Sequence, residues 1–351
     1  MTLTKKFLLL LIIIITIFVL YRLYTQRISL LKEGFREGNV DYDMSSKSEF
    51  DDLIAPLPDP PSIGDFNCPP SMTIKDLSIQ GSYNTAYTGG EYVSLNMVQY
   101  VLQRGCRFLD FEVYNIDGTP KVAVGSQPDM VDTLNSIPLA DIFGVINENA
   151  FILKEGDYGV SNPNDPLFIH LRIKNTNTNN FYSDINNIIT NSLENMLSVG
   201  ISKSTLMSDI KKKAIVLIDN NSRGYMDGNN SEIITKNGNT SSTNFKLNSN
   251  FAILTQCTNP PILDSNTMTN VTDFNIVTAD KGTTYWGYSV NPNMDILLDN
   301  YGVQVVAHKY YTYDANLQRS EALYGNFSST ITLLANAIRF VRNPDSQPES
   351  A

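Results

Sequence analysis

The sequence predicts an α/β fold, a (β/α)8 barrel preceded by a transmembrane helix, and three observations support this prediction. After residue 68, short apolar runs of strand length alternate with helix-like segments, as is typical of parallel α/β proteins. About 280 residues with roughly eight strand candidates fit one barrel. Residues 7–21 read FLLLLIIIITIFVLY and contain no charge, which indicates a membrane span.

The segment at residues 1–24 is expected to be an uncleaved anchor. A helix extended from Phe7 to Tyr24 spans ~27 Å, close to the ~30 Å of a bilayer core. A cleaved signal peptide is the alternative, but no pair of small residues follows the apolar run. Both flanks are basic, so the orientation stays open, although the positive-inside rule leans toward a body on the cytoplasmic side.

Four further regions follow from composition. Residues 25–67 are expected to form a polar, Pro-rich linker, because residues 55–61 contain four prolines. Residues 68–345 are expected to form the barrel, and residues 346–351 a tail. Residues 220–250 are rich in Asn, Ser, Thr and Gly, which predicts an exposed insertion on the C-terminal face of the barrel.

Within the barrel, β-branched and aromatic runs indicate strands, and apolar positions at i, i+3 and i+7 indicate helices. The expected strands are residues 78–80, 108–114, 121–124, 167–174, 214–219, 251–254, 275–278 and 303–309. The expected helices are residues 94–103, 142–151, 181–197 and 328–340.

Charge and composition exclude several functions. The formal net charge is −10, and because the first 40 residues carry +4, the remainder carries −14. This negative charge repels the phosphate backbone of nucleic acids, and nucleic acid is therefore not an expected partner. Three cysteines without paired spacing argue against a disulfide scaffold or a zinc ribbon. The only histidines, His170 and His308, limit any mechanism that needs a histidine pair.

Three segments stand in a specific order and spacing: residues 77–85 (LSIQGSYNT), 104–125 (RGCRFLDFEVYNIDGTPKVAVG) and 138–151 (PLADIFGVINENAF). They resemble the X region of phosphoinositide-specific phospholipase C (PLC) and its relatives. Residues 165–174 and 301–312 are similar to two later strands of that family. The resemblance runs from about residue 72 to 320. It implies a distorted TIM barrel of the PLC-like phosphodiesterase type, which cleaves phosphodiesters in membrane lipids.

The resemblance also implies a catalytic mechanism, but this sequence differs from the family at the positions of the residues that transfer protons. Such cleavage needs a base, an acid and a cation near the developing charge. In the family, two histidines are the acid and base. Here Tyr83 and Val124 stand at their positions, and neither transfers protons near pH 7, because tyrosine titrates at about 10 and valine does not titrate. The family's phosphate-binding lysines align approximately with Leu217 and Asp219.

The family's calcium site, an Asn and three carboxylates, is retained in part. Asn84 stands at the amide position, Asp110 and Glu112 stand at two carboxylate positions, and Arg172 replaces a Glu. No metal or other cofactor is therefore expected, and calcium on the first three residues is the weaker alternative. Asp110 and Glu112 alternate on one strand and are expected to point into the barrel together. If Arg172 faces them, an ion pair forms where calcium would sit.

This site allows two interpretations. In one, Arg172 is the electrophile of a metal-independent enzyme. In the other, which we favour, a residual charge network only holds the barrel together. His170 lies one pleat from Arg172 and is either a relocated catalytic base or a hydrogen-bonded core residue. We favour the core role for His170, and also for His308. Tyr83 either bonds a phosphate or packs, and Cys106 is expected to pack.

The leading hypothesis is a single-pass, membrane-anchored PLC-like barrel that has lost catalysis and has a binding or structural role. Composition and anchor suit a virion component of a large DNA virus, with membrane lipid and other membrane or capsid proteins as partners. The alternative is an active phospholipid phosphodiesterase with a metal-independent site. It fails if Arg172 and His170 lie more than about 8 Å from Asp110. A third hypothesis is a lipid-headgroup or protein-binding module that uses residues 220–250.

Overall fold

The structure is a computed structural model, and it describes residues 15–16, 42–125, 130–156, 158–174, 179–198, 201–202, 204–218, 246–248, 274–279 and 290–343. The chain divides into two compact units, residues 1–45 and 46–351. Within the described residues, no helix has both the length and the apolar character to cross a bilayer. Of the predicted anchor only Ile15 and Thr16 are described, so the anchor stays a prediction.

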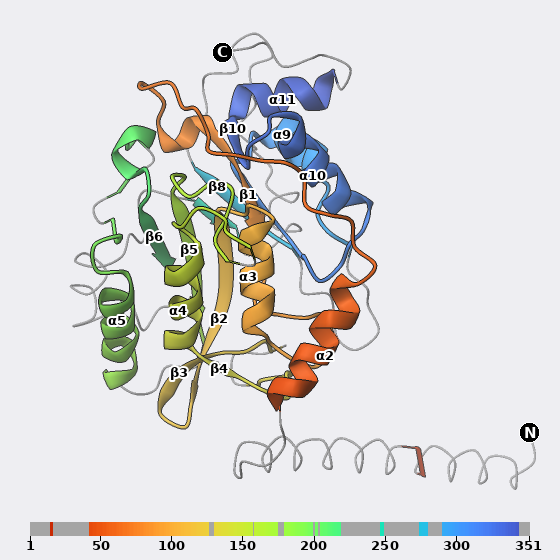
Figure 1. Cartoon of the computed structure of the whole chain (residues 1–351), viewed down its shortest axis with the longest axis vertical. Coiled ribbons are helices and arrows are strands. Elements are labelled where there is room, and N and C mark those ends of the chain that lie inside the picture. Colours follow the sequence, from red (N-terminus) through yellow and green to blue (C-terminus); the bar gives the residue numbers. More distant parts are fainter. Residues whose placement is uncertain are drawn as a thin grey trace, which may run out of the picture. The chain divides into compact units, whose positions relative to one another are not determined.

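The second unit is built on a ten-stranded sheet (Figure 1). Its centre is a run of parallel strands in the spatial order β6 (Ala214–Ile218), β5 (Leu167–Ile173), β2 (Phe108–Ile116), β1 (Leu77–Ser82), β9 (Val305–His308), β8 (Asn275–Thr278) and β7 (Lys246–Asn248). Three strands pair antiparallel at its margins: β3 (Thr119–Val122) with β2, β4 (Ile137–Pro138) with β3, and β10 (Ile331–Leu333) with β1. In the described part of the chain no pairing joins β6 to β7.

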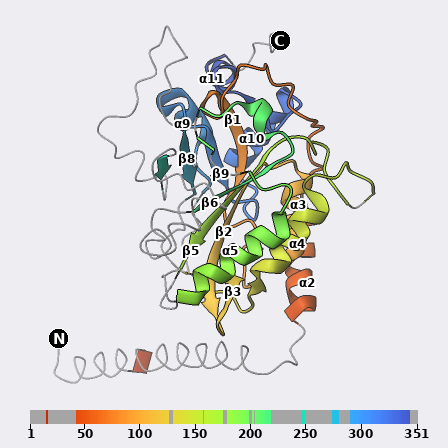
Figure 2. The ribbon, with the colours of Figure 1, turned by 90° about the vertical axis from the view of Figure 1, so that its left-hand side faces the viewer.

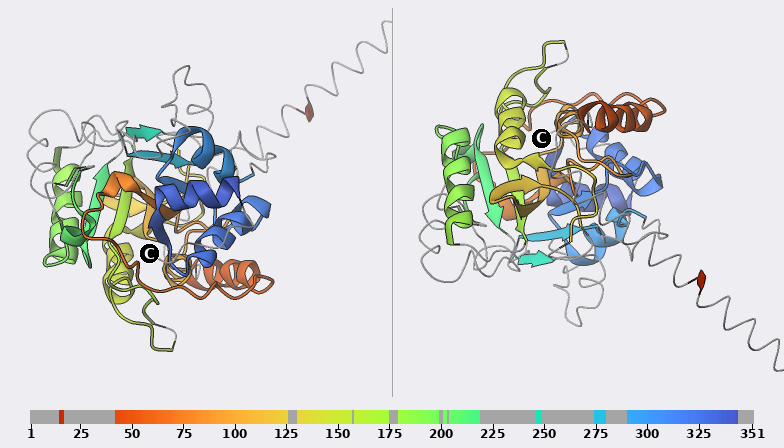
Figure 3. Two further views of the ribbon diagram at one scale, coloured as in Figure 1. Left: turned by 90° about the horizontal axis from the view of Figure 1, so that it is seen from above. Right: turned by 90° about the horizontal axis from the view of Figure 1, so that it is seen from below.

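Helices surround the parallel strands, as the views along the strands show (Figure 3). On one side are α3 (Leu95–Gln103), α4 (Leu139–Asn149) and α5 (Asn179–Leu193), and on the other are α9 (Met294–Tyr301), α10 (Ala315–Asn326) and α11 (Leu334–Arg342) (Figure 2). The other described helical elements are two 3-10 turns, η1 (Ile74–Asp76) and η2 (Met207–Ile210), and the helix α2 (Tyr42–Ile54). Helix α2 begins in the first unit and continues into the second.

Local sequence explains where several helices begin. Ser94 caps α3, because its side chain accepts a hydrogen bond from the backbone N–H of Asn96. Asn293 and Asp314 cap α9 and α10 in the same way. Helix α9 ends at Gly302, whose φ of 57° lies in the left-handed region that glycine adopts without cost.

Alternation along the strands separates an inner face from an outer face. The inner face of β1, β2, β5, β6, β8 and β9 forms one apolar cluster, which includes Phe108, Phe168 and Leu217. The outer faces pack against α3, α4 and α5 on one side and against α9, α10 and α11 on the other. Because Asp110 and Glu112 follow Phe108 at two-residue intervals, both carboxylates lie on the inner face, as predicted.

The structure corrects two expected elements. Residues 121–124 are not a barrel strand, because Thr119–Val122 fold back on β2 as an antiparallel hairpin. The turn is made by Asp117 and Gly118, both with positive φ. The helix expected at 328–340 begins only at Leu334, because the residues before it pair with β1 as β10. The helices α9 and α10 had no counterpart among the expected elements.

Other expected elements agree with the structure in part. The strand expected at 275–278 is confirmed with the same bounds as β8. The strand expected at 251–254 lies outside the described residues, as does most of the insertion 220–250, in which β7 is described. Residues 42–54 of the expected linker form α2. The Phe50 side chain of α2 is buried, with its ring centroid 6.0 Å from that of Tyr100.

Candidate functional site

The candidate site lies at the carboxyl ends of three neighbouring parallel strands, β1, β2 and β5, where barrel enzymes hold their sites. It comprises Tyr83 and Asn84 after β1, Asp110 and Glu112 on β2, and His170 and Arg172 on β5. The register of β2 against β5 places Asp110 opposite His170 and Glu112 opposite Arg172. The strand pairing therefore brings together residues that are 60 positions apart in the sequence.

Arg172 is the centre of this site. Its Nε donates to Asp110 Oδ1 at 2.9 Å, and its Nη2 donates to Asp110 Oδ2 at 2.6 Å. The Nη1 atom donates to Glu112 Oε1 at 2.5 Å and lies 3.5 Å from the Tyr83 hydroxyl. The Nη2 atom also donates to the side-chain oxygen of Asn84. A guanidinium has five N–H groups, so each of them has an acceptor within the site.

The Asp110 carboxylate is fully buried and accepts from further neighbours. The Nδ1 atom of His170 donates to its Oδ1 at 2.7 Å, and the backbone N–H of Asn84 donates to its Oδ2 at 3.0 Å. Asn84 has a φ of 46°, a conformation that Asn tolerates better than most residues. Burial raises the pKa of the Asp110 carboxyl, but Arg172 and His170 lower it more, and the net pKa lies well below its usual range.

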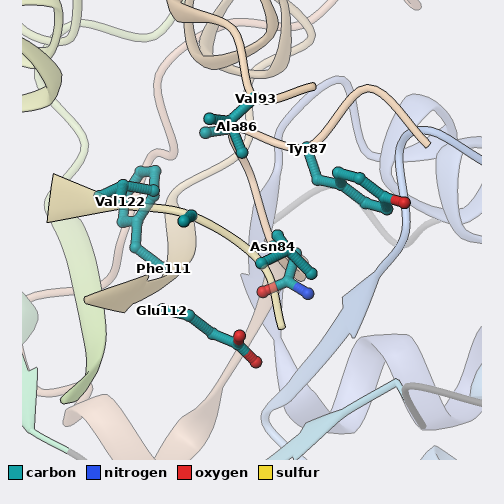
Figure 4. A pocket seen from close by; sticks show the side chains of 9 residues that line it. Asn84, Ala86, Tyr87, Val93, Phe111, Glu112 and Val122 are labelled. Carbon is teal, nitrogen blue, oxygen red and sulfur yellow. The ribbon is translucent and has the colours of Figure 1, made fainter. Parts of the chain in front are cut away.

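Glu112 is also satisfied on both oxygens. Its Oε2 accepts from the Tyr114 hydroxyl at 2.9 Å and from the backbone N–H of Gly125 at 3.1 Å. Figure 4 shows the pocket beside it, with the Asn84 amide and the Glu112 carboxylate toward one side and Val93 and Ala86 toward the other. The free space in this pocket has no room for a water molecule. The site is closed in this conformation.

His170 has the arrangement of a histidine–carboxylate pair. Its side chain is buried, and its Nε2 atom has no hydrogen-bond partner among the described residues. Its ring centroid lies 5.8 Å from that of Phe108, within the barrel interior. Both His170 and Arg172 are in hydrogen-bond contact with Asp110, so the distance criterion does not exclude the enzyme hypothesis.

Comparison with known proteins identifies the family. The family model "Phosphatidylinositol-specific phospholipase C, X domain" matches residues 71–219, a segment that contains all six site residues. Residues 71–219 therefore carry a domain of the PLC-like phosphodiesterase superfamily. No curated protein matches the chain.

Solved structures agree with this assignment at the level of the fold. PLC21 from L. pealei is 15% identical, and the similarity covers 81% of this chain and 40% of that one, with a TM-score of 0.55. PLC21 from S. officinalis gives the same identity and TM-score over 81% and 39% of the two chains. This PLC-like chain thus spans about two fifths of the length of those proteins.

Tyr83 and Val124, which the resemblance predicts at the family's histidine positions, have different surroundings. The Tyr83 ring centroid lies 4.6 Å from the Arg172 guanidinium carbon, so the ring packs against the cation. Burial raises the pKa of the Tyr83 hydroxyl well above its usual value, which keeps it protonated. Val124 is half-buried in the pocket wall, and its backbone N–H donates to the Thr133 hydroxyl at 3.4 Å.

Asn84, Asp110 and Glu112, which the resemblance predicts at the family's calcium position, do not fit a metal in this conformation. The oxygens of Asn84, Asp110 and Glu112 all face Arg172, whose guanidinium occupies the point on which they converge. Among the described residues, no group of His, Cys, Asp and Glu side chains is arranged to hold a metal.

The remaining candidate residues lie away from the cluster around Arg172. His308 is on the outer face of β9, with Nδ1 3.0 Å from the Val306 carbonyl, and burial lowers the pKa of its imidazole to about 4. Leu217 is buried inside the barrel, and Asp219 lies outside the described residues. Burial raises the pKa of the Cys106 thiol, so this thiol is not activated.

The sequence interpretation did not identify Tyr114 and Gly125, which both donate hydrogen bonds to the Glu112 carboxylate. Alternation was the available signal for Tyr114, since it is the next inward position after Asp110 and Glu112 on the same strand. Gly125 was noted only as the residue after Val124. The hydrogen bond from its backbone depends on the β3 hairpin, which the sequence interpretation did not predict.

Proposed function

We propose that this protein is a membrane-anchored PLC-like barrel that does not cleave phosphodiesters and has a binding or structural role at a membrane. The observation that carries the proposal is the state of Arg172. Its donors are all engaged by Asp110, Glu112, Asn84 and Tyr83. No donor is left to stabilise the charge that develops on a phosphate during cleavage.

Electrostatics supports the same conclusion. The charges of Asp110, Glu112 and Arg172 sum to −1, which disfavours a phosphodiester anion. Burial lowers the pKa of the Arg172 guanidinium, but Asp110, Tyr83 and Glu112 raise it more, so the net pKa lies well above its usual value. Breaking one partner out of such a buried pair costs about 3–5 kcal/mol, so the cluster resists opening.

The active phosphodiesterase is the second candidate, and one observation favours it. His170 Nδ1 is held by Asp110 while Nε2 is unpartnered within the described part of the chain, which is how a general base is oriented. This function requires the barrel to open toward solvent, since the His170 side chain is buried. It also requires Arg172 to exchange a carboxylate for the substrate phosphate.

The membrane part of the proposal rests on the uncharged segment 7–21. The proposed partners are membrane lipid, through this segment, and other membrane or capsid proteins. The proposed setting, a virion membrane, rests on composition. Alkaline extraction of membranes from expressing cells tests the anchor. The full chain is expected to stay in the pellet, and a Leu11→Arg, Ile14→Arg variant is expected to be released. Release of the unmodified chain contradicts anchoring.

Turnover assays test the loss of catalysis. The full chain in detergent is incubated with phosphatidylinositol, its phosphorylated forms and glycosyl-phosphatidylinositol, with calcium and with chelator. No turnover above buffer is expected. A parallel variant carries Tyr83→His, Val124→His and Arg172→Glu, which restores the family's side chains. Turnover by the unmodified chain that disappears in Asp110→Ala overturns the proposal and favours the metal-independent enzyme.

A further inference from the structure

Helix α2 carries an acidic side chain that is bound by the loop beside the site. This rim loop, residues 85–93, leads from Asn84 to α3. The Glu49 carboxylate accepts hydrogen bonds from the backbone N–H of Glu91 at 3.0 Å and of Tyr92 at 3.4 Å. It also accepts one from the Thr88 hydroxyl. Hydrogen bonds to a charged acceptor belong to the stronger class, so α2 is held firmly to the rim loop.

The rim loop is shaped to receive this carboxylate. A Cβ atom at Gly90 would lie 2.5 Å from Glu49 Oε2, so a side chain at position 90 would displace the Glu49 carboxylate from its present place. Phe50, the next residue of α2, is only 8% exposed and contacts Tyr100 of α3 edge to face. Figures 1 and 2 show α2 alongside α3. The helix is therefore fixed at a carboxylate and at an aromatic ring.

Hydrogen bonds continue from the rim loop to a second loop. The Asn135 side chain accepts from the backbone N–H of Val93 and donates to its carbonyl, both at 2.8 Å. The backbone N–H of Leu134 donates to the Glu91 carbonyl at 2.7 Å. The segment 133–135 is therefore tied to the rim loop by three hydrogen bonds.

The second loop reaches the candidate site. The Thr133 hydroxyl donates to the Asn135 carbonyl at 2.9 Å and accepts from the backbone N–H of Val124. The next residue, Gly125, donates to the Glu112 carboxylate. An unbroken series of hydrogen bonds and short chain segments thus runs from Glu49 to Glu112. The closed pocket beside Glu112 is lined by residues of the rim loop, among them Ala86 and Val93, and by residues 122–124, to which the second loop is hydrogen-bonded at Val124.

We propose that α2 is a strap that holds the pocket beside Glu112 closed through Glu49, and that displacing α2 opens this pocket. In the sequence, α2 directly follows the expected anchor and the first part of the expected linker. Tension or binding on that segment would then reach the site through the strap. The inference concerns the conformation of the rim and applies equally to a catalytic and a non-catalytic site, so it stands or falls independently of the proposed function.

Hydrogen exchange of the full chain in detergent tests the strap. In Glu49→Ala, backbone amides of the rim loop and of residues 122–135 are expected to exchange at least about tenfold faster, since lost charge-assisted bonds shift a local opening equilibrium by such a factor. Amides of 167–173 and 214–218 are expected to keep their rates. Asp52→Asn, on an exposed acid of the same helix, is the matched control and is expected to change neither region.

A second variant separates the strap from a general loss of stability. Gly90→Ala introduces the Cβ that conflicts with the Glu49 carboxylate, so it is expected to speed exchange at 122–135 in the unmodified chain. In the Glu49→Ala background it is expected to add nothing. Faster exchange confined to residues 88–92, equal acceleration in 167–173, or additive effects of the two variants would each overturn the proposal.

Discussion

Two buried arginines, Arg107 and Arg172, show how differently this barrel treats the same side chain. Arg107 precedes β2 at the amino end of the barrel, and Arg172 lies near the carboxyl end of β5. Arg107 donates to neutral oxygens, the Ala150 carbonyl at 2.8 Å and the side chain and carbonyl of Asn162. Arg172 is paired with two carboxylates.

The consequence is a difference in charge stability. Burial lowers the pKa of the Arg107 guanidinium to about 10, and no carboxylate among the described residues forms an ion pair with it to offset this. Burial acts on Arg172 in the same direction, but its two carboxylate partners more than reverse that effect. The amino end therefore uses an arginine as a connector of backbone segments. The carboxyl end uses one as a counter-ion for two carboxylates.

The largest expected effect follows from removing the Arg172 counter-ion. Arg172→Met leaves Asp110 and Glu112 buried without their partner, which is expected to cost about 3–5 kcal/mol of unfolding free energy. Guanidinium titration of the full chain in detergent, followed by near-ultraviolet circular dichroism, measures it. The control Arg342→Gln removes an ion pair with Asp299 whose side chains are 31% and 40% exposed, and it is expected to cost at most about 1 kcal/mol. Similar losses in the two variants would contradict the counter-ion role.

The second effect is a pH dependence of opposite sign at the two ends. Burial raises the pKa of the Asp165 carboxyl, near Arg107, to about 6. The folded state therefore holds this proton more tightly than the unfolded state, and stability falls as pH rises from about 4 to about 6. Asp110 has a lowered pKa, so its contribution is present above about pH 4 and is lost as pH falls.

Asp165→Asn tests this sign. The variant is expected to remove up to about 3 kcal/mol of the decline in unfolding free energy between about pH 4 and pH 6. Denaturant titrations at several pH values measure the slope. A slope that is unchanged in Asp165→Asn would show that another group titrates in this window.

The third effect is at Arg107 itself. Arg107→Met removes donors from two buried carbonyl oxygens but leaves no carboxylate in direct contact without a partner, so a cost of about 1–3 kcal/mol is expected. This is smaller than the effect of Arg172→Met, and the same titration compares them. A larger loss at Arg107 would reverse the comparison between the two ends of the barrel.

The smallest effect concerns the support of Glu112. Tyr114→Phe removes one hydroxyl donor from a carboxylate that keeps Arg172 and Gly125, so a cost of about 1–2 kcal/mol is expected. Tyr158→Phe, on a ring that is 65% exposed, is the matched control and is expected to be neutral. Equal stability of the two variants would mean that the Tyr114 hydroxyl does not stabilise the ion pair.

The sequence by itself indicated the family of residues 71–219 and supplied the candidate site residues. The order of the motifs between residues 77 and 151 was enough, because each motif is a local pattern. Alternation likewise placed Asp110 and Glu112 on one face, since the direction of a strand side chain has a period of two residues. The sequence likewise predicts that Arg172 stands where the family has a carboxylate, and this stays a prediction.

Only the tertiary structure decided what those residues contact. The parallel register of β2 against β5 sets which side chains are opposite each other, and no local pattern encodes a register between strands 60 residues apart. The same holds for α2, whose helix is weakly patterned and whose Glu49 finds its partners some 40 residues later in the chain. Long-range pairing and packing select these contacts, because local propensities are small beside the free energy of burying a shared core.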